Sequence, residues 1–270
     1  MKNLLAVLVL APALVFAAEK GPDKGTKPPL PGVDWNAKTI RATGRGAPNL
    51  NAPSVAAARI GAEKAAEMDA LRNILAVLKG IQINAEKTVG DAMAGSNEIS
   101  AKLEGEAKAF KRVNTRYFSD GGVEIDVEMS IAELFAEVAP IVDAPKAAEV
   151  LQKVPATGEP KNTGLVIDAS GLRPKPALAP RLLDEGGKEV YSSAVVEPTA
   201  LKSNGIAGYL KSLDEARKSS RVGAKPLVIK ALRVAGASDL VIANVDAERL
   251  RDPKGNVSFL GEGRVIIVAE

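Results

Sequence analysis

The clearest alternation of apolar and polar residues lies between residues 123 and 131. Five apolar residues at every second position are separated by four polar ones, beginning at Val123 and ending at Ile131. A period of two is typical of a strand with one buried face. We expect residues 110–118 to form its antiparallel partner, joined by a three-residue turn at 119–121 with Gly121 in a left-handed conformation. Counting back from this turn pairs Arg116 with Glu124, Asn114 with Asp126, Arg112 with Glu128, Tyr117 with Val123, Thr115 with Ile125 and Val113 with Val127.

The longest helical pattern covers residues 51–80. We expect Asn51 to cap this helix, Pro53 to lie in its first turn and Gly80 to end it. Many of its apolar residues are small, so its backbone can lie close to a sheet. An apolar stripe in steps of three or four positions runs through Ala58, Gly61, Ala65, Met68, Leu71, Leu75 and Leu78.

The remaining pattern mixes strands and helices without a regular β-α-β order. A first strand is predicted at 33–44, with Trp35 as its anchor and Gly44 and Gly46 as its end. Residues 81–89 begin as an alternating strand, 90–109 are ambiguous, and 131–154 are helical or irregular. Later strands are predicted at 164–169, 227–234, 240–243 and 265–268, a hairpin at 184–187, and short helices at 216–222 and 245–250.

This pattern predicts an α+β protein with two small domains. The first covers 33–154, with the long helix packed on an antiparallel sheet, and the second covers 164–270. The Pro- and Gly-containing stretch 155–163 has the composition of a linker. We expect the two domains to fold independently.

The N-terminus has the pattern of an export signal. Lys2 precedes an apolar run from Leu4 to Phe16, which is shorter than the roughly 20 residues that a membrane-spanning helix needs. Val15 and Ala17 fit the small residues of a cleavage site, so we expect a signal peptide at 1–17 and a mature chain that starts at Ala18. Residues 18–32 are rich in Pro, Gly and Lys and are expected to form a disordered tether.

The composition excludes several kinds of chemistry. The chain has no Cys and no His, which removes disulfides, thiol nucleophiles, imidazole catalysis and zinc sites of the usual ligands. Only 3% of the residues are aromatic and the formal net charge is +3, one unit of which comes from Lys2, so nucleic-acid binding is not expected. No catalytic residue, cofactor or metal ion is expected.

Four short segments contain residues that could form binding or catalytic sites. The acidic row Glu124, Asp126 and Glu128 could bind calcium, but a solvated strand face paired with Arg112 and Arg116 explains it better. Gly44-Arg45-Gly46 could be a phosphate-binding loop, but a turn that ends a strand explains it better. Residues 244–251 could hold a catalytic Asp/Glu pair, but a short helix capped by Asn244 or Asp246 is the better interpretation. The Pro-rich stretch 173–181 is an exposed loop that could contact an anionic polymer through Arg173, Lys175 and Arg181.

Two regions resemble known envelope proteins. Residues 40–134 resemble the lpp-twenty family of bacterial envelope lipoproteins, related to flagellar assembly protein P, through 42–48 (ATGRGAP), 56–81 and 112–131 (RVNTRYFSDGGVEIDVEMSI). Residues 164–191 and 239–270 resemble a region found downstream of that domain in related proteins. The resemblance implies an envelope protein, periplasmic or associated with the outer membrane, and transfers no site residues. Relatives are anchored through a lipidated cysteine that this chain lacks, which favours a form without a lipid anchor.

These observations favour a non-enzymatic structural or assembly protein of the cell envelope, with links to the flagellum. Its expected partners are envelope proteins or further copies of itself, with no transmembrane helix in the mature chain. A module that binds peptidoglycan or lipopolysaccharide is the alternative, and secretion is an alternative location. A carboxylate-based hydrolase would require a pocket with two carboxyl groups within about 10 Å.

Overall fold

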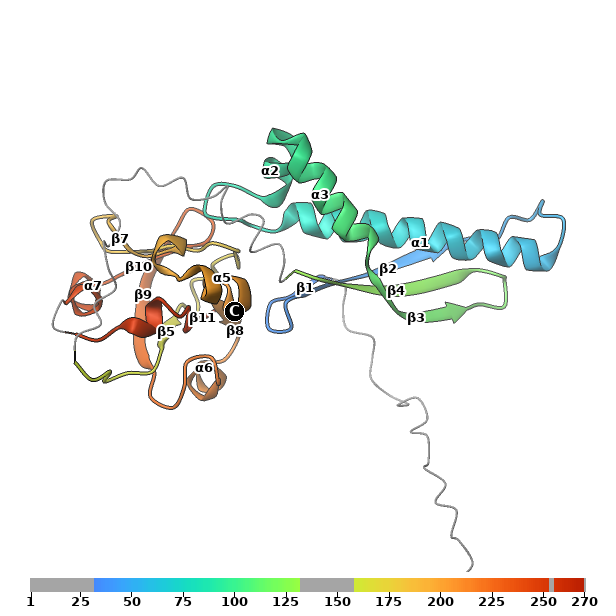
Figure 1. Cartoon of the computed structure of the whole chain (residues 1–270). Coiled ribbons are helices and arrows are strands. Elements are labelled where there is room, and N and C mark those ends of the chain that lie inside the picture. Colours follow the sequence, from blue (N-terminus) through green and yellow to red (C-terminus); the bar gives the residue numbers. More distant parts are fainter. Residues whose placement is uncertain (1–31, 132–157, 253–254, 270) are drawn as a thin grey trace, which may run out of the picture.

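The protein is described from a computed structural model, which places residues 32–131, 158–252 and 255–269. It is an α+β protein with two sheets, as predicted (Figure 1). The signal peptide 1–17, nearly all of the tether, the segment 132–154 and the first part of the linker lie outside the described residues. Gly32, assigned to the tether, instead begins a strand.

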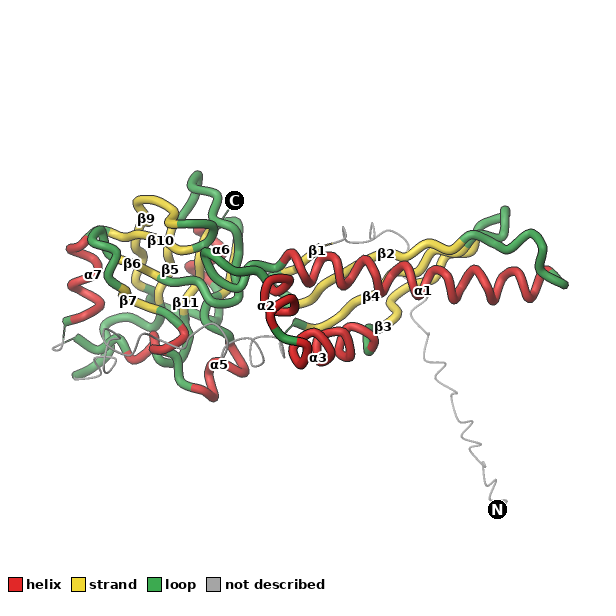
Figure 2. The backbone as a smooth tube through the Cα atoms, turned by 90° about the horizontal axis from the view of Figure 1, so that it is seen from above, coloured by secondary structure: helices red, strands yellow, loops and turns green. Residues whose placement is uncertain are grey.

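The first unit, residues 32–131, is an elongated antiparallel sheet with one long helix lying along it (Figures 1 and 2). The strand order is β1-β2-β4-β3, so β3 forms an edge of the sheet. The 26 residues of α1 correspond to a length of about 39 Å. The elements are β1 (Gly32–Asp34), β2 (Thr39–Gly46), α1 (Val55–Gly80), α2 (Val89–Gly95), α3 (Asn97–Lys108), β3 (Lys111–Tyr117) and β4 (Val123–Ser130).

The first strand differs from the prediction. Residues 33–44 form a β1–β2 hairpin instead of one strand, because Asp34 Oδ1 accepts hydrogen bonds from the backbone N–H groups of Asn36 and Ala37 and turns the chain. Gly44 lies within β2 and does not end it, whereas Gly46 is its last residue, as predicted. Both glycines lie against the backbone of α1, so they mark a close approach of helix and strand.

The buried face of α1 also differs from the predicted stripe. Met68 of the predicted stripe is 73% exposed, and Leu78 is the one stripe residue that is buried; the other buried residues of α1 lie one position away from the stripe. Ser54, not Asn51, caps the helix by accepting a hydrogen bond from the Ala57 N–H at 3.1 Å. The buried residues repeat every four positions: Ala62, Ala66, Ala70, Ile74 and Leu78.

The β3–β4 hairpin confirms the predicted register over most of its length. Gly121 has a φ of 87°, the Phe118 N–H donates to the Gly122 carbonyl, and Asn114 to Tyr117 have the expected partners. The prediction is wrong at the other end of β3. A bulge around Val113 shifts the register, so Arg112 lies opposite Val127 and Lys111 opposite Glu128.

Residues 81–109 contain two helices and almost no strand. Gln82 forms only isolated bridges, one with Thr88 and one with Ala177. Thr88 and Asp91 form a reciprocal capping box at the start of α2, and Ser96 caps α3. Local capping therefore decides the region that hydrophobic periodicity left ambiguous.

The second unit, residues 158–269, contains a mixed seven-stranded sheet of order β7-β6-β10-β9-β5-β11-β8. The strands predicted at 164–169, 227–234, 240–243 and 265–268 and the hairpin at 184–187 are confirmed, whereas β8 had no signal in the sequence. The strands are β5 (Leu165–Asp168), β6 (Leu182–Leu183), β7 (Glu189–Tyr191), β8 (Gly208–Leu210), β9 (Leu227–Ala235), β10 (Asp239–Ile242) and β11 (Val265–Val268).

The helices of the second unit are short. The helix predicted at 216–222 lies earlier, because Ser212 caps it at Glu215, and the helix predicted at 245–250 is confirmed. Asn244 begins that helix after Ala243, which occupies the cap position, and neither Asn244 nor Asp246 caps it. The helices are α5 (Pro198–Asn204), α6 (Leu213–Lys218) and α7 (Asn244–Arg251), with 3-10 turns at Ser193–Val195 and Ser258–Leu260.

The two units contact each other directly. The rings of Trp35 and Tyr209 meet edge to face with centroids 5.3 Å apart. The Ala179 N–H donates to the Ile83 carbonyl at 2.7 Å, and Leu178 is buried in the core of the first unit. Independent folding of the two units stays a prediction, and these contacts are what would couple them.

Candidate functional site

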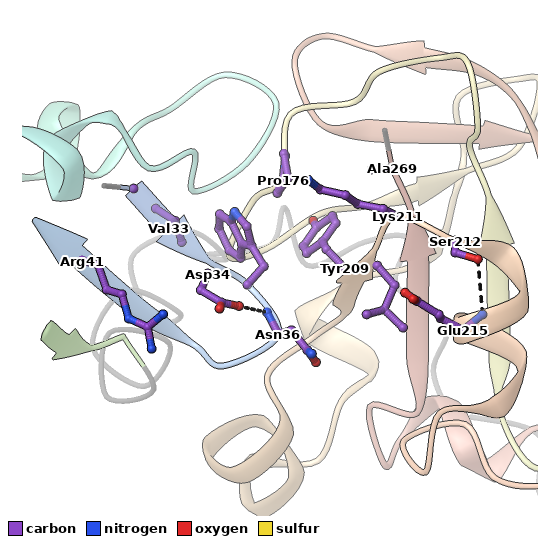
Figure 3. A pocket seen from close by; sticks show the side chains of 13 residues that line it. Val33, Asp34, Asn36, Arg41, Pro176, Tyr209, Lys211, Ser212, Glu215 and Ala269 are labelled. Carbon is purple, nitrogen blue, oxygen red and sulfur yellow. Dashed lines mark hydrogen bonds between the residues drawn. The ribbon is translucent and has the colours of Figure 1, made fainter. Parts of the chain in front are cut away.

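A cleft of about 650 Å³ lies where the two units meet (Figure 3). The β1–β2 turn supplies Trp35 and Asn36 from the first unit, and β8 supplies Tyr209 from the second. Clefts between units are common places for ligand binding because both sides can contribute contacts. The cleft is therefore the first candidate site.

The two aromatic rings of the cleft are held rigidly. The Tyr209 hydroxyl both accepts a hydrogen bond from the Ala177 N–H and donates one to the Ala177 carbonyl, each at 3.0 Å. Burial raises the pKa of Tyr209, so its hydroxyl stays protonated at neutral pH. Trp35 packs against this fixed ring. The pair provides a preformed apolar wall and not a reactive phenolate.

The charged groups of the cleft have both signs. Asp34 and Arg41 come from the first unit, and Lys211 and Glu215 come from the second. The Asp34 carboxylate is occupied by the backbone N–H groups of its own turn, and Arg41 forms an ion pair with Glu128 at 2.6 Å. The cleft thus combines a ring wall with mixed polar groups, an arrangement suited to holding a neutral or weakly charged polar ligand.

The stretch 173–181 was predicted to be an exposed loop, but residues 174 and 177–180 are buried, so the three predicted polymer contacts are not equivalent. Arg173 and Lys175 are exposed, in a loop whose next residue, Pro176, lines the cleft. Arg181 forms an ion pair at 2.7 Å with Asp239, whose side chain is only 1% exposed. Burial raises the pKa of Asp239 although Arg181 opposes the shift, so removal of Arg181 would leave a buried carboxyl group unpaired. Of the three predicted contacts, Arg173 and Lys175 are therefore the exposed ones, whereas Arg181 is engaged with Asp239.

The acidic row on β4 is neutralised by arginines. Arg116 donates to Glu124 at 3.0 Å and also to Asp126, as predicted. Arg112 instead pairs with Glu67 of α1, because of the bulge, and Arg41 pairs with Glu128. Hydrogen bonds from Arg45 and Arg116 hold the pKa of Glu124 below its ordinary value. Among the residues that the structure describes, no group of His, Cys, Asp and Glu could hold a metal ion.

A second candidate site is an apolar surface at the far end of the first unit. We call Leu50, Val55, Tyr117 and Phe118 the tip surface. Their exposed fractions are 90%, 81%, 53% and 49%. The β2–α1 loop and the β3–β4 turn converge there, at the end of the first unit that lies away from the second (Figure 1).

The parts of the tip surface are held together by specific contacts. Tyr117 donates its hydroxyl hydrogen to Glu63 at 3.0 Å, and the Arg59 guanidinium lies 5.5 Å from its ring centre. A Cβ atom on Gly121 would lie 3.3 Å from Pro48, which places the turn beside the loop. The sequence did not predict this surface because Leu50 and Val55 lie outside any regular pattern. Tyr117 does pair with Val123 as expected, but it stays half exposed because β3 is an edge strand.

Comparison with known proteins gives one match, in the second unit. Residues 164–270 match the family model described as the second domain of Treponema pallidum Tp0624. No curated protein matches the chain. No helix in the described part of the chain is long and apolar enough to cross a membrane. The second unit is therefore similar to a domain that occurs as part of a larger bacterial protein, and its limits agree with the predicted start at Gly164.

Proposed function

We propose that this chain is a non-enzymatic protein of the cell envelope that acts by contact, with the tip surface as its docking site for an envelope protein. The observation that carries the proposal is the exposure of four large apolar side chains at the end of an elongated unit whose long helix alone measures about 39 Å. Clustered exposed apolar groups with a polar surround are typical of protein interaction sites.

The surroundings of the tip surface favour a protein partner. Two ion-paired or hydrogen-bonded carboxylates, Glu63 and Glu67, lie beside it on α1, together with Arg59 and Arg112. A rim of both charge signs around aromatic and aliphatic groups suits a protein surface, whereas an anionic lipid surface would favour a rim of positive charge alone. Envelope location rests on the export signal, and the link to the flagellum rests on the resemblance of residues 40–134 to the lpp-twenty family.

Photo-crosslinking tests the docking site. A photoreactive residue at Phe118 should form a discrete adduct with an envelope protein, and the same probe at Val245 should not. Val245 is a matched control because it is 64% exposed and apolar but lies on α7 of the second unit. Leu50→Asp should abolish the adduct from position 118. Equal adducts from both positions, lipid adducts alone or none at all would contradict the proposal.

A second candidate function is binding of a cell-wall polymer at the cleft. It is favoured by the position of Arg173 and Lys175 next to a cleft walled by Trp35 and Tyr209, since aromatic faces pack against sugar rings and basic groups pair with anionic ones. Sedimentation with purified peptidoglycan tests it. Arg173→Ala with Lys175→Ala should then weaken co-sedimentation several-fold, while Arg249→Ala with Lys188→Ala, which remove two exposed positive charges from residues that line neither pocket, should not.

The counter-test for both functions is a broad hydrolase screen. The cleft contains two carboxylates, Asp34 and Glu215, and Glu215 is exposed. Turnover that is abolished by Glu215→Gln would overturn the non-enzymatic proposal.

A further inference from the structure

A separate polar pocket of about 450 Å³ lies next to the cleft, on the side of Arg221. Its wall includes six polar side chains from four segments and, in contrast to the cleft, no carboxylate. They are Asn36, Asn204, Ser219, Ser220, Arg221 and Arg264. The hydrogen-bond donors of this pocket are therefore not accompanied by a carboxylate in its lining.

Arg221 is the central group of the pocket. Its guanidinium donates to the backbone carbonyls of Asn204, Gly205 and Gly263 at 2.6, 3.1 and 2.6 Å. All three acceptors are neutral, and within the described residues no carboxylate forms an ion pair with it. Its Nε is buried and has no hydrogen-bond partner. A buried guanidinium without a counter-ion is costly, because its charge has been removed from water and not compensated.

Positive charge accumulates around Arg221. Burial and the nearby charge of Arg221 lower the pKa of Lys38, whose ammonium group donates to the Ser203 carbonyl at 2.8 Å. Arg264 also lines the pocket, and it pairs with Glu262, which is half exposed, at 3.3 Å. Cations from both units thus lie in or near one pocket.

Gly208 lines the pocket and lies directly against the Arg221 side chain. A Cβ atom at this position would lie 3.3 Å from Arg221 Cδ and 3.6 Å from Arg221 Nε. Hydroxyl and amide donors from Ser220 and Asn36 line the same pocket. The pocket therefore combines one partly buried positive charge with neutral donors, and any side chain larger than glycine at position 208 would press on the arginine.

We propose that this pocket binds a phosphate-type oxyanion, with Arg221 as the buried positive charge and Arg264, Ser220 and Asn36 as further donors. Guanidinium groups match the oxygens of phosphate in charge and geometry. Arg221 also stabilises the end of α5 through its contacts with the Asn204 and Gly205 carbonyls, so its positive charge is held beside the pocket without a carboxylate partner among the described residues. The site does not depend on the tip surface, so it goes beyond the proposed function.

An isosteric substitution tests the site without unfolding the protein. Asn36 is exposed, so Asn36→Asp adds a negative charge at the mouth of the pocket and keeps its shape. In calorimetric titration of the exported protein, inorganic phosphate should bind saturably below about 10 mM, and Asn36→Asp should weaken binding at least about tenfold. Asn49→Asp is the matched control, since it makes the same change at an exposed loop residue of the first unit.

A second variant adds a methyl group to the pocket lining and leaves the charge of the pocket unchanged. Gly208→Ala should also weaken phosphate binding several-fold, while Gly61→Ala, which meets no atom within 4 Å, should not. Absence of saturable binding would overturn the proposal, and so would equal weakening by Asn36→Asp and Asn49→Asp or unchanged binding in Gly208→Ala.

Two further experiments distinguish a lipid phosphate from a soluble one. If the phosphate belongs to a lipid, the protein should co-sediment with phosphatidylcholine vesicles that contain phosphatidylglycerol, and Asn36→Asp should release it. If it belongs to a soluble sugar phosphate, glucose 1-phosphate should compete with inorganic phosphate and the vesicles should not bind. Either result supports the site and names its ligand class. Crosslinking at the tip surface is independent of both arms, so the two proposals can fail separately.

Discussion

Two glycines determine how closely α1 lies on the first sheet. A Cβ atom on Gly44 would lie 2.0 Å from the Ala66 carbonyl oxygen, and one on Gly46 would lie 1.9 Å from the Ala62 carbonyl oxygen. Both contacts involve backbone, which cannot move as a side chain can. The helix presents alanines at these positions, so the two backbones approach as closely as their atoms allow.

Gly44→Ala should therefore destabilise the first unit strongly. The added methyl group forces α1 away from β2, and we expect a loss of about 3 kcal/mol in the free energy of unfolding, measured by urea denaturation. Gly61→Ala is the control, because this glycine lies on the open side of α1 and alanine favours helix by about 1 kcal/mol. Equal stability of the two variants would contradict the close-packing account.

The same residues explain what the sequence could and could not predict. Alanines occur on several faces of residues 56–70, so hydrophobicity alone does not distinguish the buried row at Ala62, Ala66 and Ala70 from the predicted stripe. Only the glycines of the facing strand select the row. Glycine within a strand signals either an end or a close approach, and the choice depends on the helix that lies above it.

At the level of elements, the exposed face of the first sheet is held by a ladder of charges. Arg116 bridges Glu124 and Asp126, and Arg45 also donates to Glu124 at 2.8 Å. Burial pushes the pKa of Asp126 upward, but hydrogen bonds from Arg116 and Thr43 outweigh it and hold the pKa below its ordinary value. The strands β3 and β4 are thus joined by side chains on the face opposite α1.

Arg116→Met should weaken this ladder by about 1 kcal/mol at pH 7, since the arginine is about one-third exposed and its ion pairs are partly screened. Both carboxyl groups have lowered folded-state pKa values, so their contribution is present above the unfolded pKa of about 4 and is lost as the pH falls through the folded values. The stability difference between wild type and variant should accordingly shrink on acidification in urea titrations at several pH values.

Arg72→Met provides the control for this prediction. Arg72 pairs with Asp69 at 3.0 Å but its side chain is 74% exposed, so its removal should change stability by less than about 0.5 kcal/mol. A difference for Arg116→Met that stays constant with pH would show that packing and not charge is lost.

The β3–β4 hairpin could be predicted from the sequence near its turn but not at its far end. Turn chemistry at Gly121 correctly fixed the register near the turn, because a three-residue loop specifies which residues face each other. The bulge around Val113 was not predictable, since no glycine or proline marks it. Strand β8 was not predicted either, because a strand of three residues is too short to show an alternation of apolar and polar positions.

At the scale of the whole molecule, Trp35 connects the two cores. It packs partly buried against both the cluster around Tyr209 and the cluster around Ile40, and it is the only tryptophan of the chain. No pattern in residues 33–44 indicates that its partner lies more than 170 positions away. The cleft and the polar pocket, which share Asn36 and Tyr209, could not be predicted because they exist only where the units meet.

Trp35→Ala should uncouple the two units. The sequence predicted independent folding, but the contacts between the units lead us to expect that both units of the wild type unfold in one calorimetric transition, with tryptophan fluorescence changing together with helical circular dichroism. The variant loses the ring contact with Tyr209, so the interaction between the units should weaken by about 2 kcal/mol. This loss is smaller than that expected for a fully buried tryptophan. The single transition should then split into two. Phe118→Ala removes a half-exposed ring at the tip surface and should leave a single transition. Two transitions already present in the wild type would mean that the units fold independently, and the cleft between them would then be a contact that forms after folding and not a part of it.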